Sequence, residues 1–134
     1  MLEVLIIDDD DVVIFIQKKM ITNHKISSEP VSFKKAQQAL DYLDENQDSN
    51  NHFLILLDIN MPGMDGWEFL ESINEKPKNH QIHVIMVTSS IDLKDKKKAL
   101  KYSVVRDFVE KPISSAHCEK IKQLPELSGF FSEA

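Results

Sequence analysis

The chain reads Phe-Leu-Ile-Leu-Leu-Asp-Ile-Asn-Met-Pro-Gly-Met-Asp-Gly at residues 53–66. Five consecutive apolar residues before Asp58 and a Pro-Gly turn indicate a strand that is buried on both faces and ends in a carboxylate. An aspartate at the end of a strand is also common as a turn or helix-capping residue. The other strand ends must therefore decide whether Asp58 has a structural or a chemical role.

The composition predicts a single domain. The chain has 134 residues, with 16 basic and 22 acidic side chains, which suits one hydrophobic core. The acidic balance argues against direct nucleic-acid binding, which depends on basic side chains that displace counterions. No apolar run approaches the roughly 18 residues of a membrane span, and no signal-type leader is recognisable. We therefore expect a cytoplasmic protein that makes no membrane contact. Cys118 is the only cysteine, so no internal disulfide is expected.

Apolar runs alternate with helical spacing along the chain. Strands are predicted at residues 2–7, 53–57, 82–87 and 104–109, with a weaker edge strand within 26–33 that Pro30 interrupts. Helices are predicted at residues 11–24, around 36–43 with Ser32 as cap, from the capping box of Asp65 and Glu68 to before Pro77, around 91–100, and from Ser114 or Ser115 to before Pro125. Alternating strands and helices form a parallel sheet that helices cover on both faces.

The helical patterns also predict apolar faces. In the first helix these positions are Val12, Val13, Phe15, Ile16 and Met20, and in the fourth they are Ile91, Leu93, Ala99 and Leu100. The fourth helix also holds a cluster of lysines, which we interpret as a solvated face that could recruit an acidic partner. None of the five histidines falls at the C-terminal end of a predicted strand, so we expect all of them at the surface or rim.

Polar side chains follow four of the predicted strands. Asp8 and Asp9 end the first strand, Asp58 the third, Thr88 the fourth and Lys111 the fifth. The C-terminal ends of parallel strands lie at one edge, where ligands bind. Two like charges about 4 Å apart repel by roughly 4 kcal/mol at an effective dielectric near 20, so three converging carboxylates require a cation. Oxygen ligands favour Mg²⁺.

These groups are the ones that phosphoryl transfer uses. A metal and a lysine neutralise phosphoryl oxygens, a hydroxyl donates to one of them, and a carboxylate can attack phosphorus to form an acyl phosphate. The sequence therefore predicts that Asp58 is a nucleophile.

Four segments resemble the receiver domain of two-component response regulators, the CheY-like family. They are Ile-Ile-Asp-Asp at 6–9, Asp-Ile-Asn-Met-Pro-Gly-Met-Asp-Gly at 58–66, Met-Val-Thr-Ser at 86–89 and Val-Glu-Lys-Pro at 109–112. The resemblance implies an α/β fold, a doubly wound (βα)5 flavodoxin-like sandwich whose five-stranded parallel sheet has the order 2-1-3-4-5. It also implies a cis peptide bond between Lys111 and Pro112.

The resemblance assigns a metal site and a phospho-acceptor. Asp58 would accept the phosphoryl group and would bind Mg²⁺ together with Asp9 and the backbone carbonyl of Asn60. Asp8 would act mostly through metal-bound water.

The resemblance also assigns the phosphoryl contacts and a switch. Thr88 would bind a phosphoryl oxygen, and Lys111 would pair with the phosphoryl group. Movement of Thr88 and Phe108 would alter a protein-binding face. Many family members have tyrosine where this chain has Phe108, and a half-buried packing role for this side chain is an equal alternative.

We therefore expect a single-domain response regulator that is not a turnover enzyme. The receiver domain would span residues 1–125, followed by a C-terminal tail at 126–134. A sensor histidine kinase or a phosphotransfer protein would supply the phosphoryl group, and the modified protein, a monomer or weak dimer, would signal to an unknown output protein.

Two alternatives stay open. A phosphatase of the haloacid dehalogenase type also uses a strand-end aspartate with Mg²⁺, but it places a second aspartate two residues later, where this chain has Asn60. A pseudo-receiver would only bind, and the complete set of acidic, hydroxyl and lysine side chains argues against it.

Overall fold

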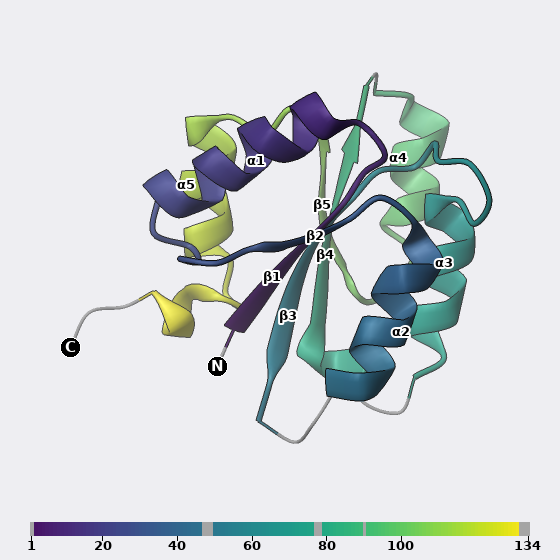
Figure 1. The fold of residues 1–134 in the computed structure, drawn as a ribbon, viewed down its shortest axis with the longest axis horizontal. Coiled ribbons are helices and arrows are strands. Elements are labelled where there is room, and N and C mark those ends of the chain that lie inside the picture. The colour runs from purple at the N-terminus through teal and green to yellow at the C-terminus, as the bar shows by residue number, and fades with distance from the viewer. Residues whose placement is uncertain (1, 47–49, 77–78, 90, 132–134) are drawn as a thin grey trace.

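A five-stranded parallel sheet lies between two layers of helices (Figure 1). The computed structural model describes residues 2–46, 50–76, 79–89 and 91–131. The strands are β1 (Leu2–Ile7), β2 (Val31–Phe33), β3 (His52–Leu57), β4 (Ile82–Thr88) and β5 (Val105–Glu110). The helices are α1 (Asp11–Asn23), α2 (Ala36–Asn46), α3 (Gly66–Asn74), α4 (Leu93–Ala99) and α5 (Ser115–Gln123), with 3-10 turns η1 (Asn79–Gln81) and η2 (Ser128–Phe130). The order β2-β1-β3-β4-β5 confirms the predicted fold class and topology.

The apolar strands separate two hydrophobic clusters. Helices α1 and α5 cover one face of the sheet, and α2, α3 and α4 cover the other (Figure 1). Side chains of β3 alternate between the clusters: Leu54 and Leu56 pack toward α1 and α5, whereas Phe53, Ile55 and Leu57 pack toward α2 and α3. A strand covered on both faces needs apolar residues at every position, which explains the continuous run that the sequence shows.

The two edge strands, β2 and β5, are irregular at the positions where the apolar pattern of the sequence is interrupted. Strand β2 begins only after Pro30 and pairs with β1 alone, as the interrupted pattern predicted. The prediction that Ser32 caps the second helix was wrong, because Ser32 lies inside β2. In β5, Val105 pairs with Val84 and Asp107 pairs with Ile85, so Arg106 is an extra residue that bulges from the ladder.

The predicted apolar face of α1 was largely wrong, although Met20 packs against the core as predicted. The helix buries Ile14, Gln17 and Ile21 instead, while Val12 and Phe15 are 65% and 62% exposed. Residues three and seven positions apart lie on one side of a helix, so both sets satisfy helical spacing. Which set faces the sheet depends on how the loop after β1 orients the helix. That orientation is fixed by tertiary packing and cannot be read from the spacing of apolar residues.

One histidine also contradicts its predicted place. His83 is buried in β4; its Nδ1 accepts a hydrogen bond from Nε of Arg106, and its Nε2 lies 3.2 Å from Nδ1 of His52. These partners satisfy the buried ring in a way that no local pattern could indicate. The side chain of His80 lies outside the described part of the chain.

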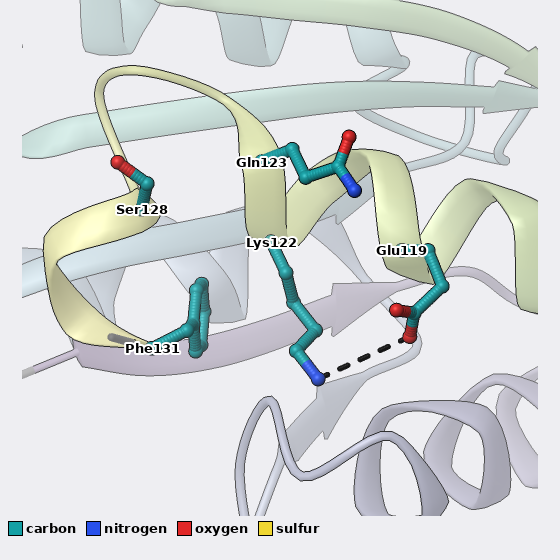
Figure 2. A pocket seen from close by; sticks show the side chains of 5 residues that line it. All are labelled: Glu119, Lys122, Gln123, Ser128 and Phe131. Carbon is teal, nitrogen blue, oxygen red and sulfur yellow. Dashed lines mark ion pairs between the residues drawn. The ribbon is translucent and has the colours of Figure 1, made fainter. Parts of the chain in front are cut away.

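The segment after α5 packs back onto the domain. Leu127 is buried in the cluster under α1 and α5, and the ring of Phe130 lies 5.2 Å from that of His52, the first residue of β3. An open pocket of about 480 Å³ lies here, lined by Glu119, Lys122, Gln123, Ser128 and Phe131 (Figure 2). It lies near the N-terminal ends of the strands, away from the polar side chains that follow their C-terminal ends.

Among the described helices, none has the length and apolar character that a membrane span requires.

The first residue of α3, Gly66, lies close in space to the end of β3. Asp65 and Glu68 form the predicted capping box, with the Glu68 N–H donating to Asp65 Oδ1 at 2.9 Å. The N–H of Gly66 donates to the carbonyl of Ile59 at 2.9 Å. A Cβ atom at Gly66 would lie 2.6 Å from the carbonyl oxygen of Asp58, so only glycine allows this approach without a shift of the backbone.

We predict that Gly66→Ala lowers the free energy of unfolding by about 1–3 kcal/mol, because the added methyl group must displace backbone atoms. Urea denaturation followed by circular dichroism measures the change. Gly129→Ala is the matched control, since a Cβ at Gly129 meets no atom within 4 Å, and its effect should stay within about 0.5 kcal/mol. Equal stability of the two variants would contradict the close approach.

Candidate functional site

Two adjacent strand ends bring the acidic residues together. Strands β1 and β3 pair in parallel register from Leu2 with His52 to Ile7 with Leu57. The ladder continues one step further, because the Asp58 N–H donates to the Ile7 carbonyl at 3.0 Å. Asp8 and Asp58 therefore leave the sheet side by side.

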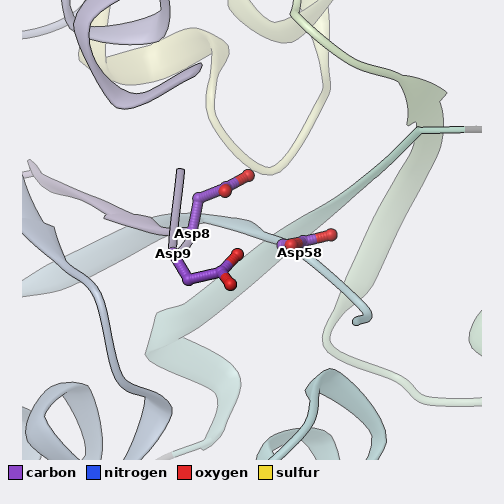
Figure 3. Close-up of side chains that lie close together, drawn as sticks. All are labelled: Asp8, Asp9 and Asp58. Carbon is purple, nitrogen blue, oxygen red and sulfur yellow. The ribbon is translucent and has the colours of Figure 1, made fainter. Parts of the chain in front are cut away.

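Three carboxylates converge at this edge, as predicted. One oxygen from each of Asp8, Asp9 and Asp58 lies within 4.8 Å of the others (Figure 3). Asp8 and Asp58 are buried, whereas Asp9 is exposed. The site therefore combines two desolvated carboxylates with one that is open to solvent.

The aspartates that follow β1 have two different roles: Asp8 and Asp9 belong to the acidic cluster, and Asp10 caps a helix. Asp10 is the N-cap of α1, and its Oδ1 accepts hydrogen bonds from the N–H groups of Val12 and Val13 at 2.9 and 3.4 Å. Its own N–H donates to Asp8 Oδ1 at 2.9 Å. This cap was not predicted from the sequence, although an aspartate just before a helix is the usual signal of a cap. The cap uses Asp10 and leaves Asp8 and Asp9 for the site.

Lys111 supplies the positive charge at this edge. Its Nζ lies 3.2 Å from Asp8 Oδ2 and 3.3 Å from Asp58 Oδ2. Its backbone N–H donates to the carbonyl of Thr88 at 2.7 Å, which ties the end of β5 to that of β4. The peptide bond to Pro112 is cis, as expected. The lysine therefore bridges carboxylates from two strands at once.

The two buried carboxylates, Asp8 and Asp58, are costly to ionise. Burial raises the pKa of Asp58, the charge of Asp8 raises it further, and Lys111 and the N–H of Asn60 lower it without offsetting the rise. The pKa of Asp8 is likewise raised, first by burial, against the lowering effects of the Asp10 N–H and Lys111. Burial lowers the pKa of Lys111, but the two carboxylates outweigh it and the net direction is upward.

The donor set fits a hard divalent cation. Every clustered side chain offers carboxylate oxygens, the ligands that Mg²⁺ prefers. In the described part of the chain, Lys111 pairs with Asp8 and Asp58 at this cluster, and three carboxylates with one ammonium group leave two negative charges unbalanced. The pKa values of Asp8 and Asp58 are raised because the two groups are buried close to other negative charge. A bound cation would lower both values, because it stabilises the ionised carboxylates.

The remaining predicted residues lie near this edge or beneath it. Thr88 is the buried last residue of β4. Phe108 is buried in the cluster that faces α2, α3 and α4. It is therefore fully enclosed, whereas the alternative to a switch role was a half-buried packing side chain. Asn60 is exposed in the loop after β3, and its N–H donates to the Asp58 carboxylate. The switch role of Thr88 and Phe108 and the metal role of the Asn60 carbonyl stay predictions.

We predict that Asp58→Asn raises the free energy of unfolding at neutral pH by about 1 kcal/mol or more when a chelator is present. The raised pKa means that the folded state holds a proton on Asp58 more tightly than the unfolded state, so stability falls as pH rises above about 3.8. The advantage of the variant should shrink as pH falls toward that value.

Urea unfolding at a series of pH values tests this prediction. Asp41→Asn, a change of the same type at an exposed carboxylate on α2, should shift stability by no more than about 0.5 kcal/mol. A destabilised Asp58→Asn protein at neutral pH would contradict the electrostatic account.

Comparison with known proteins agrees with the fold. The profile of the response regulator receiver domain matches residues 4–122. The chain is 33% identical over 111 residues to the transcriptional regulatory protein CitT of Halalkalibacterium halodurans, covering 83% of this chain and 46% of that protein. It is 35% identical over 115 residues to the transcriptional regulatory protein MalR of Bacillus subtilis, covering 84% and 45%. The chain thus spans about half the length of these curated relatives.

Solved structures show the same similarity. A two-component response regulator from Cytophaga hutchinsonii superposes with a TM-score of 0.79 at 30% identity, covering 90% of this chain and 92% of that chain. One from Legionella pneumophila gives 0.70 at 35% identity, covering 90% and 94%. Receiver domains are signalling domains, which favours this interpretation over the phosphatase alternative. The chain belongs to the response regulator receiver domain family, whose members accept phosphoryl groups in two-component signalling.

Proposed function

We propose that Asp58 accepts a phosphoryl group from a phosphohistidine of a sensor histidine kinase or phosphotransfer protein. One observation carries the proposal: Asp58 lies with Asp8 and Asp9 in one acidic cluster, and Lys111 reaches its Oδ2 at 3.3 Å. A metal ion bound by the acidic cluster would lie on one side of the Asp58 carboxylate, and the ammonium group of Lys111 lies on the other. Phosphoryl transfer requires positive charge of this kind around the phosphoryl oxygens.

The transfer makes one bond and breaks one. An oxygen of Asp58 forms the new bond to phosphorus while the phosphorus–nitrogen bond of the phosphohistidine breaks, and the imidazole leaves with the electron pair of that bond. Lys111 then pairs with the phosphoryl oxygens, and the hydroxyl of Thr88 donates to one of them. The position of both side chains at the same sheet edge supports these roles.

We assign the metal site to Asp8, Asp9, Asp58 and the backbone carbonyl of Asn60. Asp9 and Asp58 would bind the ion directly, and Asp8 would act through water. Mg²⁺ bound there would neutralise charge on the phosphoryl oxygens. The oxygen-only donor set and the excess of two negative charges support the assignment.

An exposed apolar surface on α1 is suited to the phosphodonor protein. Val12 and Phe15 are largely exposed and Ile16 is partly exposed, and they follow Asp10 directly at the acidic edge. Exposed apolar groups beside a charged site are typical of protein contacts. A protein donor that packs on this surface would hold its phosphohistidine close to Asp58.

The output would follow movement at the ends of β4 and β5. We propose that Thr88 shifts toward the phosphoryl group and that Phe108 changes its packing, which alters the surface formed by α4, β5 and α5. We also place the receiver domain at residues 1–125 and the tail at 126–134. Residue 1 and residues 132–134 lie outside the described part of the chain.

We predict that acetyl phosphate or phosphoramidate with Mg²⁺ adds one phosphoryl group to the protein and that Asp58→Asn abolishes the addition. Intact-mass spectrometry measures the added group. A chelator should also prevent labelling, because the carboxylates alone repel the incoming anion.

Asp65→Asn is the matched control for this experiment. It makes the same chemical change seven positions along the chain, and asparagine still caps a helix, so labelling should match that of the wild-type protein. Equal labelling of the Asp58→Asn protein would reject the assigned acceptor.

A further inference from the structure

A pocket of about 320 Å³ lies between the start of α2 and the loop that joins β3 to α3 (Figure 1). It is lined by Lys35, Ala36 and Gln37 on one side and by Pro62, Gly63 and Met64 on the other. The two segments follow the C-terminal ends of β2 and β3. The pocket therefore lies at the same edge of the sheet as the acidic cluster, and its volume falls within the range of about 300–1,000 Å³ that small-molecule sites occupy.

The pocket combines apolar walls with one positive charge. Ala36 is buried, and Met64 is partly buried against the core cluster that α2 and α3 cover. Lys35 is the only charged residue of the six that line the pocket, and among the described residues its ammonium group forms no ion pair. Its neighbour Lys34 is paired with Asp11 instead. An ammonium group beside apolar walls complements a carboxylate that is carried on an apolar body.

The pocket beside α5 lacks this property, because its charged groups already have partners. Glu119 pairs with His24 at 3.0 Å and with Lys122 at 3.9 Å. Nζ of Lys122 also donates to the carbonyl of His24 at 3.1 Å. A charged ligand in that pocket would have to replace these contacts, so the pocket beside α2 is the better candidate for a ligand site.

The loop that forms one wall of the pocket has a fixed backbone shape. Gly63 has a φ of +77°, in the left-handed region that other residues rarely adopt. Three residues later, Gly66 donates its N–H to the carbonyl of Ile59 and packs against the carbonyl of Asp58. The two glycines thus hold this wall in place beside the end of β3, and a preformed pocket binds a ligand with a smaller loss of conformational entropy.

We propose that this pocket binds a small carboxylate with an apolar body, such as an aryl acetate, and that the bound ligand slows phosphoryl acceptance by Asp58. The carboxylate would pair with Lys35, and the apolar body would pack on Pro62 and Met64. Binding would cancel a positive charge at the sheet edge that an anionic phosphodonor must approach. The effect on Asp58 rests on the proposed function, whereas the binding does not.

Titration of the nitrogen-labelled full chain with phenylacetate, followed by heteronuclear NMR, tests the binding. The backbone amides of Ala36, Gly63 and Met64 should shift saturably. Lys35→Glu should weaken binding at least tenfold, because attraction becomes repulsion, and Met64→Ala should weaken it about threefold. Lys97→Glu makes the same change at an exposed lysine of α4 and should alter affinity less than twofold. Phenylacetamide, the uncharged analogue of similar shape, should bind at least fivefold more weakly.

The rate of labelling by acetyl phosphate with Mg²⁺ tests the effect on Asp58. Saturating phenylacetate should slow labelling of the wild-type chain about twofold, and it should leave the rate of the Lys35→Glu protein unchanged. Sodium acetate at the same concentration is the control for ionic strength, because it carries the same charge without the apolar body.

Several results would overturn the proposal. These are no saturable shift of the pocket amides, equal binding of phenylacetamide, equal weakening by Lys35→Glu and Lys97→Glu, or an unchanged labelling rate at saturating phenylacetate. Intact labelling without phenylacetate binding would reject only this inference. Phenylacetate binding by a wild-type chain that cannot be labelled would reject the proposed acceptor role and leave the binding site in place.

Discussion

The parallel pairing of β1 with β3 is the constraint on which the acidic site depends. It aligns Ile7 with Leu57, so that the next residue of each strand is an aspartate at the same height. The remaining strands flank this pair, and Lys111 arrives from β5, two strands away from β3. Its ammonium group offsets part of the repulsion between Asp8 and Asp58. A change in strand register by one residue would turn either aspartate away from the site.

Much of this arrangement could be predicted because it follows from local chemistry. Continuous apolar runs occur where both faces of a strand are covered, and polar residues at their ends then gather at one edge. The positions of Asp8, Asp58, Thr88 and Lys111 follow from that rule. The strand order does not follow from it; the prediction of the order came from family resemblance, and the structure and the family match confirm it.

The features that could not be predicted depend on tertiary packing. Helical spacing in α1 fits two possible faces, and the structure buries the one with Ile14 and Ile21. In α4 the same spacing suggested a buried face, yet the helix is short and rests on Ala99. The approach of Gly66 to the Asp58 carbonyl involves backbone atoms eight positions apart, and no side-chain pattern reports it. Both misjudged helices carry exposed apolar groups, which makes them candidates for protein contacts.

The pairing of β1 with β3 also bears on how the protein is made. Residues 2–7 lie against residues 52–57, so a chain emerging from the ribosome cannot form the centre of its sheet until β3 has been released. The site waits longer still, because Lys111 belongs to the segment that follows β5. A nascent chain that ends before β5 has the aspartates but lacks the ammonium group that holds them. The complete site can therefore form only after nearly the whole domain has been synthesised.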